Sequence, residues 1–195
     1  MPSEVRLVVG LGNPGPEYVG TRHNVGFLTA DRFVGECEAS WGPSPVGDGL
    51  AARVRLDDGP DLWAAKPHTY MNESGTMVAP LARYFKIPPG AVLVVSDDMD
   101  LPLGRIRVRA KGSSGGQRGL DSILRHLGST EVPRIRLGVG PRPERMEAAD
   151  FVLGRFRPEE REAAERLIER GAEAVRTVLR DGVAAAMNAF NGGES

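Results

Sequence analysis

The sequence VRLVVGLGNPG, residues 5–15, joins a short apolar run to a turn rich in glycine and proline. Residues 5–9 are mostly apolar and β-branched, which is typical of a strand buried on both faces of a sheet. Gly10, Gly12 and Gly15 follow at the spacing of the fingerprint that binds dinucleotides. A strand that runs into such a turn predicts an α/β domain, and it raises the question of whether the turn binds a nucleotide cofactor.

Two prolines in this turn argue against a dinucleotide site. A dinucleotide loop needs a helix that begins at its third glycine, but Pro14 and Pro16 flank Gly15 and disfavour helical geometry in the residues before them. The acidic residue expected about 20 residues later is also missing, because Asp31 falls in a helical pattern. The sequence instead predicts a rigid turn that presents Asn13 at the carboxyl end of a strand, where α/β sheets bind ligands. A purely structural role for Asn13 in the turn is the alternative.

Helical and strand-like patterns alternate along the rest of the chain. Apolar residues recur at helical spacing in four segments: residues 24–33, 72–85, 120–127 and 159–179. Runs that predict strands occupy five segments: residues 50–56, 62–65, 91–96, 105–109 and 135–139. A turn signal at residues 57–61 joins the first two of these strands into a hairpin. The alternation predicts a single three-layer α/β domain with a mixed, largely parallel central sheet flanked by helices.

We expect this domain to span residues 1–195. The segment 140–150 is rich in proline and charge, so we expect it to form a mobile lid. The helices at the C-terminal end are predicted over residues 158–190, with Pro158 near the first turn of the longer one.

Composition limits the classes of protein to which the chain belongs. Of its 195 residues, 41% are hydrophobic, which is enough to fill the core of one domain. The net charge of −1 is uninformative, but residues 101–120 contain five basic side chains and no acidic one. No apolar run approaches the ~18 residues of a membrane span. The N-terminus lacks the pattern of a signal peptide, so we expect a cytoplasmic protein.

Three histidines and one cysteine are candidate bases and nucleophiles. Cys37 lies between acidic neighbours with no cation to activate its thiol, and a single cysteine excludes an intramolecular disulfide. His126 fits a structural position at a helix end, and His68 lies in a predicted loop. His23 follows the glycine turn, so it would approach Asn13 and is the best candidate for a general base. A surface histidine at a helix start is the alternative.

A cluster of carboxylates follows the predicted strand 91–96. It comprises Asp97, Asp98 and Asp100. A carboxylate beside His23 would fix its tautomer and stabilise the imidazolium. The alternatives are an acidic turn or a Mg²⁺ site, although neither further oxygen ligands nor a phosphate-binding loop accompanies the cluster. Because no serine lies on the sharp turn from a predicted strand into a helix that forms a nucleophile elbow, water is the expected nucleophile.

Two further segments carry polar groups at predicted helix starts. Asn72, in KPHTYMNESG, either caps a helix or donates a hydrogen bond to a carbonyl oxygen that gains negative charge. The segment RIRVRAKGSSGGQRGL, residues 105–120, joins a basic strand to a Gly/Ser loop whose amides suit a phosphate. A solvated, charged edge strand is the alternative.

Four segments of the chain now form a set: VVGLGNPGPEYVGTRHNVGF, KPHTYMNESG, VSDDMDLPLGRIRVRAKGSSGG and FVLGRF. In order and spacing they resemble the bacterial peptidyl-tRNA hydrolase family, over most of residues 5–190. The resemblance implies a monomeric α/β enzyme that uses neither metal nor cofactor and needs no protein partner or membrane. It also implies that the enzyme binds the acceptor stem and 3′ end of peptidyl-tRNA. The reaction would hydrolyse the ester between the peptide and the 3′-terminal ribose, which recycles the tRNA.

The resemblance assigns roles to individual residues. His23 resembles the base that activates water, and Asp97 resembles the carboxylate that orients it. The expected substrate contacts are Asn13, Tyr18, Met71 and Asn72. The expected contacts to tRNA phosphates are Arg107, Arg109, Lys111 and Arg136.

The chain departs from the family pattern at one place. The family frequently reads Gly-Gly-His-Asn-Gly where this chain has Gln117 and Arg118 between glycines. Arg118 keeps hydrogen-bond donors but adds a permanent charge and loses the acceptor, so we expect it to contact a tRNA phosphate at the substrate site.

Two other functions are compatible with parts of the sequence. One is a catalytically idle, hydrolase-like RNA-binding protein of the kind that acts in splicing, which would have no need of His23 and Asp97. The other is an aminopeptidase or phosphorylase of similar sheet architecture, which the missing metal-ligand cluster disfavours.

Overall fold

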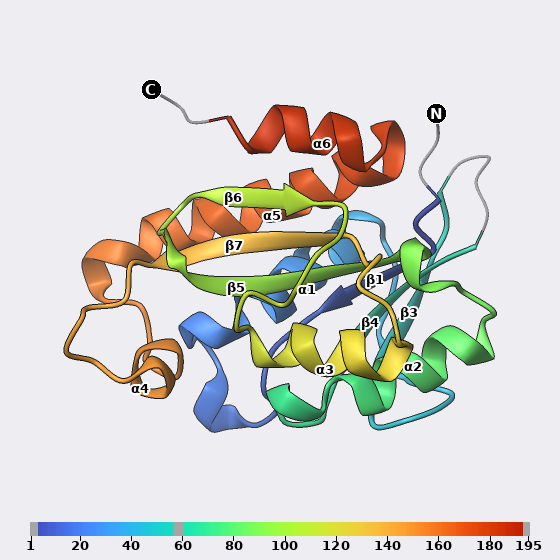
Figure 1. Cartoon of the computed structure of the whole chain (residues 1–195), viewed down its shortest axis with the longest axis horizontal. Coiled ribbons are helices and arrows are strands. Elements are labelled where there is room, and N and C mark those ends of the chain that lie inside the picture. The colour runs from blue at the N-terminus through green and yellow to red at the C-terminus, as the bar shows by residue number, and fades with distance from the viewer. Residues whose placement is uncertain (1–3, 57–60, 193–195) are drawn as a thin grey trace.

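A seven-stranded sheet forms the middle layer of the computed structural model, which describes residues 4–56 and 61–192 (Figure 1). The strands are β1 (Leu7–Gly10), β2 (Gly42–Pro43), β3 (Gly49–Val54), β4 (Leu62–Pro67), β5 (Val92–Pro102), β6 (Ile106–Arg109) and β7 (Arg134–Gly140). Their order across the sheet is β2-β3-β4-β1-β5-β7-β6. The four central strands β4, β1, β5 and β7 are parallel, whereas β2, β3 and β6 pair antiparallel with their neighbours. The predicted mixed, largely parallel sheet is confirmed.

Helices cover both faces of the sheet (Figure 1). They are α1 (Val25–Glu36), α2 (Gly75–Tyr84), α3 (Arg118–Leu127), α4 (Ala148–Val152), α5 (Arg161–Asp181) and α6 (Val183–Phe190). On one face α1 packs against α5, and on the other α2 packs against α3. The helix α6 continues from α5 and covers β6. These contacts confirm the three-layer α/β architecture.

Short 3₁₀ turns precede three of these helices and the strand β5. They comprise Pro16–Tyr18, Arg22–Asn24, Met71–Glu73, Pro89–Ala91 and Pro158–Glu160. The helices α1, α2 and α5 therefore begin one to three residues later than the apolar pattern predicts, whereas α3 begins two residues earlier, at Arg118. Pro158 opens the turn before α5.

Strand β1 contributes to two separate cores, as a strand between two helical layers must. Leu7 and Val9 belong to the apolar cluster under α2 and α3, whereas Val8 belongs to the cluster under α1 and α5. All three side chains are fully buried. Burial of each contributes roughly 1.5–3 kcal/mol, so the opening stretch of sequence anchors both layers.

A close backbone approach fixes α1 over the ends of β1 and β5. A Cβ on Gly26 would lie 2.5 Å from the carbonyl oxygens of both Leu11 and Val95, so only glycine fits there. The N–H of Phe27 donates to the Leu11 carbonyl at 3.1 Å, which holds the start of α1 in this position. The residues just before α1 consequently lie beside the distal half of β5.

Local details of the structure differ from what the sequence pattern favours at two places. An asparagine before a helix is a common cap, but the Asn24 side chain bonds to the glycine turn and does not cap α1. Asp97 and Asp98 lie within β5 rather than in a turn after it, and the register with β7 shifts only beyond Asp98. The hairpin partners β3 and β4 pair antiparallel as predicted, but residues 57–60 of the predicted turn lie outside the described residues. Within the described part of the chain, no helix is long and apolar enough to cross a membrane.

Candidate active site

A cavity of about 300 Å³ lies beyond the carboxyl end of β1, beside the distal half of β5. The start of α3 and the short helix α4 form two further walls. Of the predicted site residues, seven line this cavity: Asn13, His23, Met71, Asn72, Asp97, Arg118 and Arg136. Segments far apart in the sequence therefore meet at one place, where an α/β sheet binds its ligands.

The histidine and one carboxylate form a pair in this cavity. His23 Nδ1 lies 2.8 Å from Asp97 Oδ2, and their side chains are 13% and 3% exposed. Because the carboxylate accepts a hydrogen bond from Nδ1–H, the neutral imidazole presents its Nε2 lone pair. No hydrogen bond to Nε2 occurs within residues 4–56 and 61–192, so this nitrogen is available to a water or substrate in the cavity.

The remaining carboxylate oxygens of Asp97 and Asp98 also face nitrogen donors. Gln117 Nε2 donates to Asp97 Oδ1 at 3.1 Å. Asp98 Oδ2 lies 2.8 Å from Arg136 Nη2, and Asp98 Oδ1 accepts from the Asp100 N–H at 2.9 Å. The described residues contain no group of three His, Cys, Asp or Glu side chains arranged to hold a metal ion. The cluster is thus oriented toward nitrogen donors and not toward a shared cation position.

The glycine turn is held by reciprocal hydrogen bonds between two asparagines. The Asn13 N–H donates to Asn24 Oδ1 at 2.8 Å, and Asn24 Nδ2 donates to the Asn13 carbonyl at 3.0 Å. The Asn13 side chain is buried, and its Oδ1 accepts from the Met71 N–H at 2.8 Å. With Oδ1 bound, the amide NH₂ of Asn13 is the group left to donate into the cavity.

Asn72 does not cap a helix. It lies inside the 3₁₀ turn Met71–Glu73, and α2 begins three residues later at Gly75. Its side chain is exposed at the cavity, and it forms no hydrogen bond with any other described residue. The alternative of a structural cap is wrong, and the amide of Asn72 is free to contact a ligand.

Several predicted contacts lie outside the cavity lining. Tyr18 is half-buried on the turn before His23, and Arg107 and Arg109 lie on β6 at the edge of the sheet. Lys111 is exposed and forms an ion pair with Glu131 at 3.2 Å. These side chains can reach only a ligand larger than the cavity.

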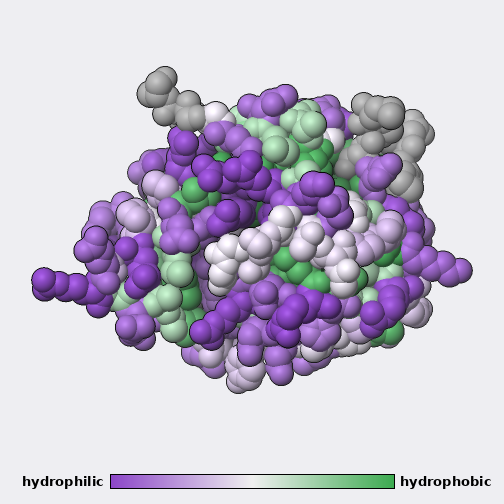
Figure 2. Space-filling model, in the orientation of Figure 1, coloured by the Kyte–Doolittle hydropathy of each residue, from purple (hydrophilic) through white to green (hydrophobic). Residues whose placement is uncertain are grey.

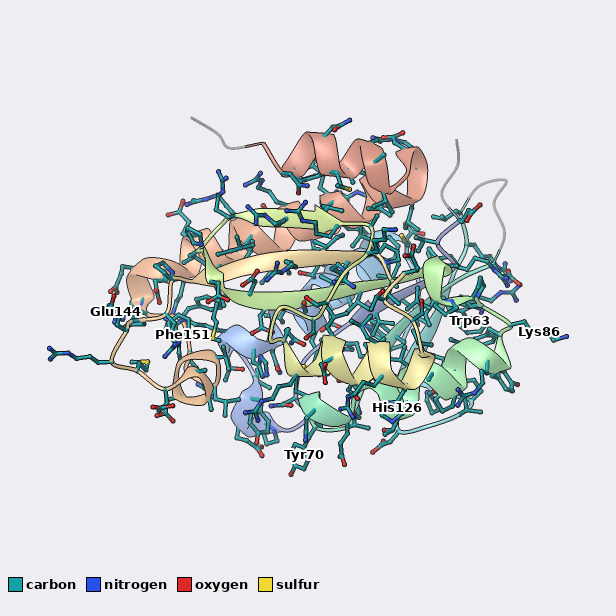
Figure 3. The ribbon with its side chains drawn as sticks, viewed as in Figure 1. Trp63, Tyr70, Lys86, His126, Glu144 and Phe151 are labelled. Atoms are coloured by element: carbon teal, nitrogen blue, oxygen red, sulfur yellow. The ribbon has the colours of Figure 1, made fainter. Side chains whose placement is uncertain are left out.

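The remaining histidines and the cysteine have structural surroundings. His126 lies at the far end of α3 from the cavity (Figure 3), and its Nδ1 lies 2.8 Å from the Ser122 carbonyl. His68 is half-buried with its ring beside that of Phe27. Burial raises the pKa of the Cys37 thiol, which makes it less reactive.

Two buried arginines support the site without lining the cavity. Neither role could be predicted from the sequence. Arg134 donates to the carbonyls of Gly112 and Ser113 at 2.9 and 2.7 Å, so it holds the Gly/Ser loop in place. Burial and the nearby Arg136 lower the pKa of Arg134. An arginine at alternate positions of a strand looks like a solvent-facing residue in sequence, so only the loop contacts identify it.

Arg22 holds the α4 segment against the turn that carries His23. Its guanidinium donates to the Arg155 carbonyl and to Glu160 Oε2, each at 2.7 Å, and lies 4.6 Å from the centre of the Phe151 ring. Figure 3 shows Phe151 close to the Arg22–Asn24 turn. The wall formed by α4 is therefore fixed directly beside the histidine.

Comparisons with known proteins cover almost the whole chain. A family model described as peptidyl-tRNA hydrolase matches residues 7–195. The peptidyl-tRNA hydrolase of Chloroflexus aurantiacus is 45% identical over 186 residues, which are 95% of this chain and 98% of that protein. The peptidyl-tRNA hydrolase of Elusimicrobium minutum is 41% identical over 188 residues, which are 96% of this chain and 99% of that protein. A crystal structure of peptidyl-tRNA hydrolase from Acinetobacter baumannii matches with a TM-score of 0.90 at 32% identity, covering 98% of this chain and 96% of that one.

Proposed function

Because this chain belongs to the peptidyl-tRNA hydrolase family, we propose that the His23–Asp97 pair hydrolyses the ester between a peptide and the 3′-terminal ribose of tRNA. An N-blocked amino acid would serve in place of the peptide. The reaction recycles tRNA from peptidyl-tRNA that has been released prematurely. The observation that carries this proposal is the 2.8 Å contact between the buried carboxylate and His23 at the wall of the cavity.

The geometry supports a direct attack by water. His23 Nε2 accepts a proton from a water as its oxygen bonds to the ester carbonyl carbon, and Asp97 stabilises the imidazolium that forms. The tetrahedral intermediate then collapses: the bond to the ribose oxygen breaks, and that oxygen takes the proton from Nε2. Since an alkoxide of ribose leaves more readily than an amine, one base and one water suffice without a covalent intermediate.

Two amides are placed to stabilise the charge on the carbonyl oxygen. The Asn13 NH₂ is held by the bond from Met71 to its Oδ1, and the Asn72 amide lies exposed on the next segment of the wall. Met71 is buried between them and provides an apolar contact. Donors fixed in advance toward a developing negative charge lower the barrier because they need no reorganisation.

Basic residues at the cavity and on the neighbouring surface suit the phosphates of the acceptor stem. Arg118 is exposed at the cavity, Arg107 and Arg109 lie on the edge strand β6, and Lys111 follows them. The face in Figure 2 is mainly hydrophilic around these segments. We assign these side chains to the tRNA backbone, together with Arg136 deeper in the cavity and Tyr18 on the turn near the base.

The remaining features follow from the same proposal. We expect the chain to act as a monomer without metal, cofactor or protein partner, in the cytoplasm where peptidyl-tRNA forms. The segment 140–150 runs from the last residue of β7 into the first turn of α4. Its movement would therefore change the α4 side of the cavity.

A direct assay tests the proposal. Purified protein is mixed with a short N-blocked aminoacyl-tRNA, and the release of the N-blocked amino acid is measured for wild type and His23→Ala, with and without EDTA. We expect turnover by wild type that EDTA leaves unchanged, and a loss of several orders of magnitude in His23→Ala. No turnover by wild type would favour the RNA-binding alternative, and loss with EDTA would contradict the metal-free mechanism.

A further inference from the structure

We infer that Gln117 is a positioning residue of the reaction, because its side-chain amide fixes the carboxylate that orients His23. The inference rests on the proposed function. Gln117 stands directly before α3, and its Nε2 donates to Asp97 Oδ1 at 3.1 Å. The family resemblance places a histidine at this position, so the amide is a feature of this chain.

The orientation of the Gln117 amide follows from its partners. Its oxygen accepts from the Leu120 N–H at 2.7 Å, which satisfies one of the unpaired donors at the start of α3. If the amide were turned over, its NH₂ would face that N–H and its oxygen would face Asp97. Two donors and two acceptors would then oppose each other, so the end that faces the carboxylate is the NH₂.

This contact completes the hydrogen bonding of a buried carboxylate. Asp97 is 4% exposed, and its two oxygens face Gln117 Nε2 and His23 Nδ1. A carboxylate bonded on one oxygen only is free to rotate about its χ2 angle. By its bond to Oδ1, the amide of Gln117 keeps Oδ2 directed at His23 Nδ1. Nε2 of the imidazole then remains the acceptor.

The amide also joins three walls of the cavity. Gln117 Nε2 lies 3.3 Å from Met71 Sδ, its oxygen caps α3, and its carboxylate partner lies on β5. A Cβ on Gly119 would meet both Met71 Sδ and Leu11, so the start of α3 is packed too closely to shift. The donor is therefore held in place by the fold and does not depend on a flexible surface side chain.

Two substitutions separate the role toward Asp97 from the capping role. Gln117→Glu keeps the length and an oxygen for the Leu120 N–H but replaces the donor with a second acceptor. Gln117→Met removes both the cap and the donor. We expect kcat to fall about ten- to hundredfold in both variants, with KM changed less than about threefold, because a hydrogen bond to a charged group is lost. We expect the melting temperature to fall in both variants: in Gln117→Met because the cap is lost, and in Gln117→Glu because two carboxylates then face each other, so kcat is the quantity that separates the two roles.

The matched control is Asn188→Asp, the same amide-to-acid change on the exposed face of α6. Its kcat should equal that of wild type. If Gln117 acts only as a cap, Gln117→Glu keeps the wild-type kcat and only Gln117→Met is impaired, which overturns the inference. A wild type without turnover overturns the proposed function instead, so the two failures are distinguishable.

A spectroscopic measurement decides the case if a variant fails to fold. Gln117 is the one glutamine of the sequence, so protein labelled with side-chain ¹⁵N-glutamine gives a single amide pair in its NMR spectrum. We expect that pair to shift strongly in Asp97→Asn and little in Asp121→Asn, which removes an exposed charge on the same helix. Equal, small shifts in both variants would show that the amide does not bond to Asp97.

Discussion

His23 has one nitrogen available for chemistry, because Asp97 occupies the other. A donor from Gln117 and a donor from His23 hold that carboxylate between them. The orientation of His23 thus depends on one hydrogen bond to each oxygen of the buried Asp97 carboxylate. Arg118 is different, because it is exposed, and we expect it to act through its charge.

The charge of Arg118 can be tested by its effect on tRNA binding. We expect Arg118→Ala to weaken binding of a tRNA acceptor-stem RNA and to reduce the slope of log K against log salt by about one, since one phosphate contact is lost. Fluorescence anisotropy at several salt concentrations measures both quantities. The control is Arg125→Ala on the same helix, which pairs with Asp121 outside the cavity. An unchanged slope with intact affinity in Arg118→Ala would contradict the assignment.

At the scale of elements, a short 3₁₀ turn connects the glycine turn to α1 and carries both Arg22 and His23. The two neighbours point to different partners: His23 contacts β5, and Arg22 contacts the segment that follows α4. A five-residue helix is too short to be stable alone, so α4 depends on this contact for its place.

Removal of the Arg22 guanidinium should destabilise the protein. We expect Arg22→Met to lower the free energy of unfolding by about 2–4 kcal/mol, because it leaves the carboxylate of Glu160 without its partner at 2.7 Å. Urea unfolding followed by circular dichroism measures the change. The matched control is Arg166→Met, whose partner Glu162 is exposed, and there the loss should stay below about 0.5 kcal/mol. Equal losses in the two variants would show that the Arg22 contacts contribute no more than a surface pair.

The sequence predicted the elements that bring the site together, but not the contacts that hold it. The strand at residues 5–9 could be anticipated from its apolar pattern. A carboxylate beside His23 could be anticipated because the carboxyl ends of parallel strands meet at one edge of a sheet, and the family resemblance then singled out Asp97. The roles of Arg22, Arg134 and Gln117 could not. Each is a long polar side chain whose partner lies on a distant segment, so local pattern gives no sign of the contact.

The role of Asn24 could not be predicted from the sequence for a related reason. An asparagine before a helix is a common cap, and local preference alone favours that interpretation. In the structure its side chain bonds instead to the backbone of Asn13, eleven residues earlier. A tertiary contact outweighs the local preference here, because it satisfies buried backbone groups that no water could reach.

For the molecule as a whole, the segment 140–150 at the α4 side of the cavity contains no buried residue. The Arg142 N–H bonds to the Met99 carbonyl on β5 at 3.1 Å, and Glu144 lies on the exposed part of the loop (Figure 3). We expect amide hydrogen exchange in this loop to slow when a tRNA acceptor-stem mimic binds, because the loop then closes. Mass spectrometry of exchanged peptides measures this, with the exposed end of α6 as reference. Identical protection with and without RNA would contradict a lid.

The cavity draws its walls from segments between Asn13 and Leu153, which follow one another along most of the chain. While the ribosome synthesises this protein, the growing chain is itself a peptidyl-tRNA. A nascent chain that ends before α4 has the base and its carboxylate but lacks one side of the cavity. The complete cavity therefore needs residues up to Leu153, so it can form only after most of the chain has been synthesised.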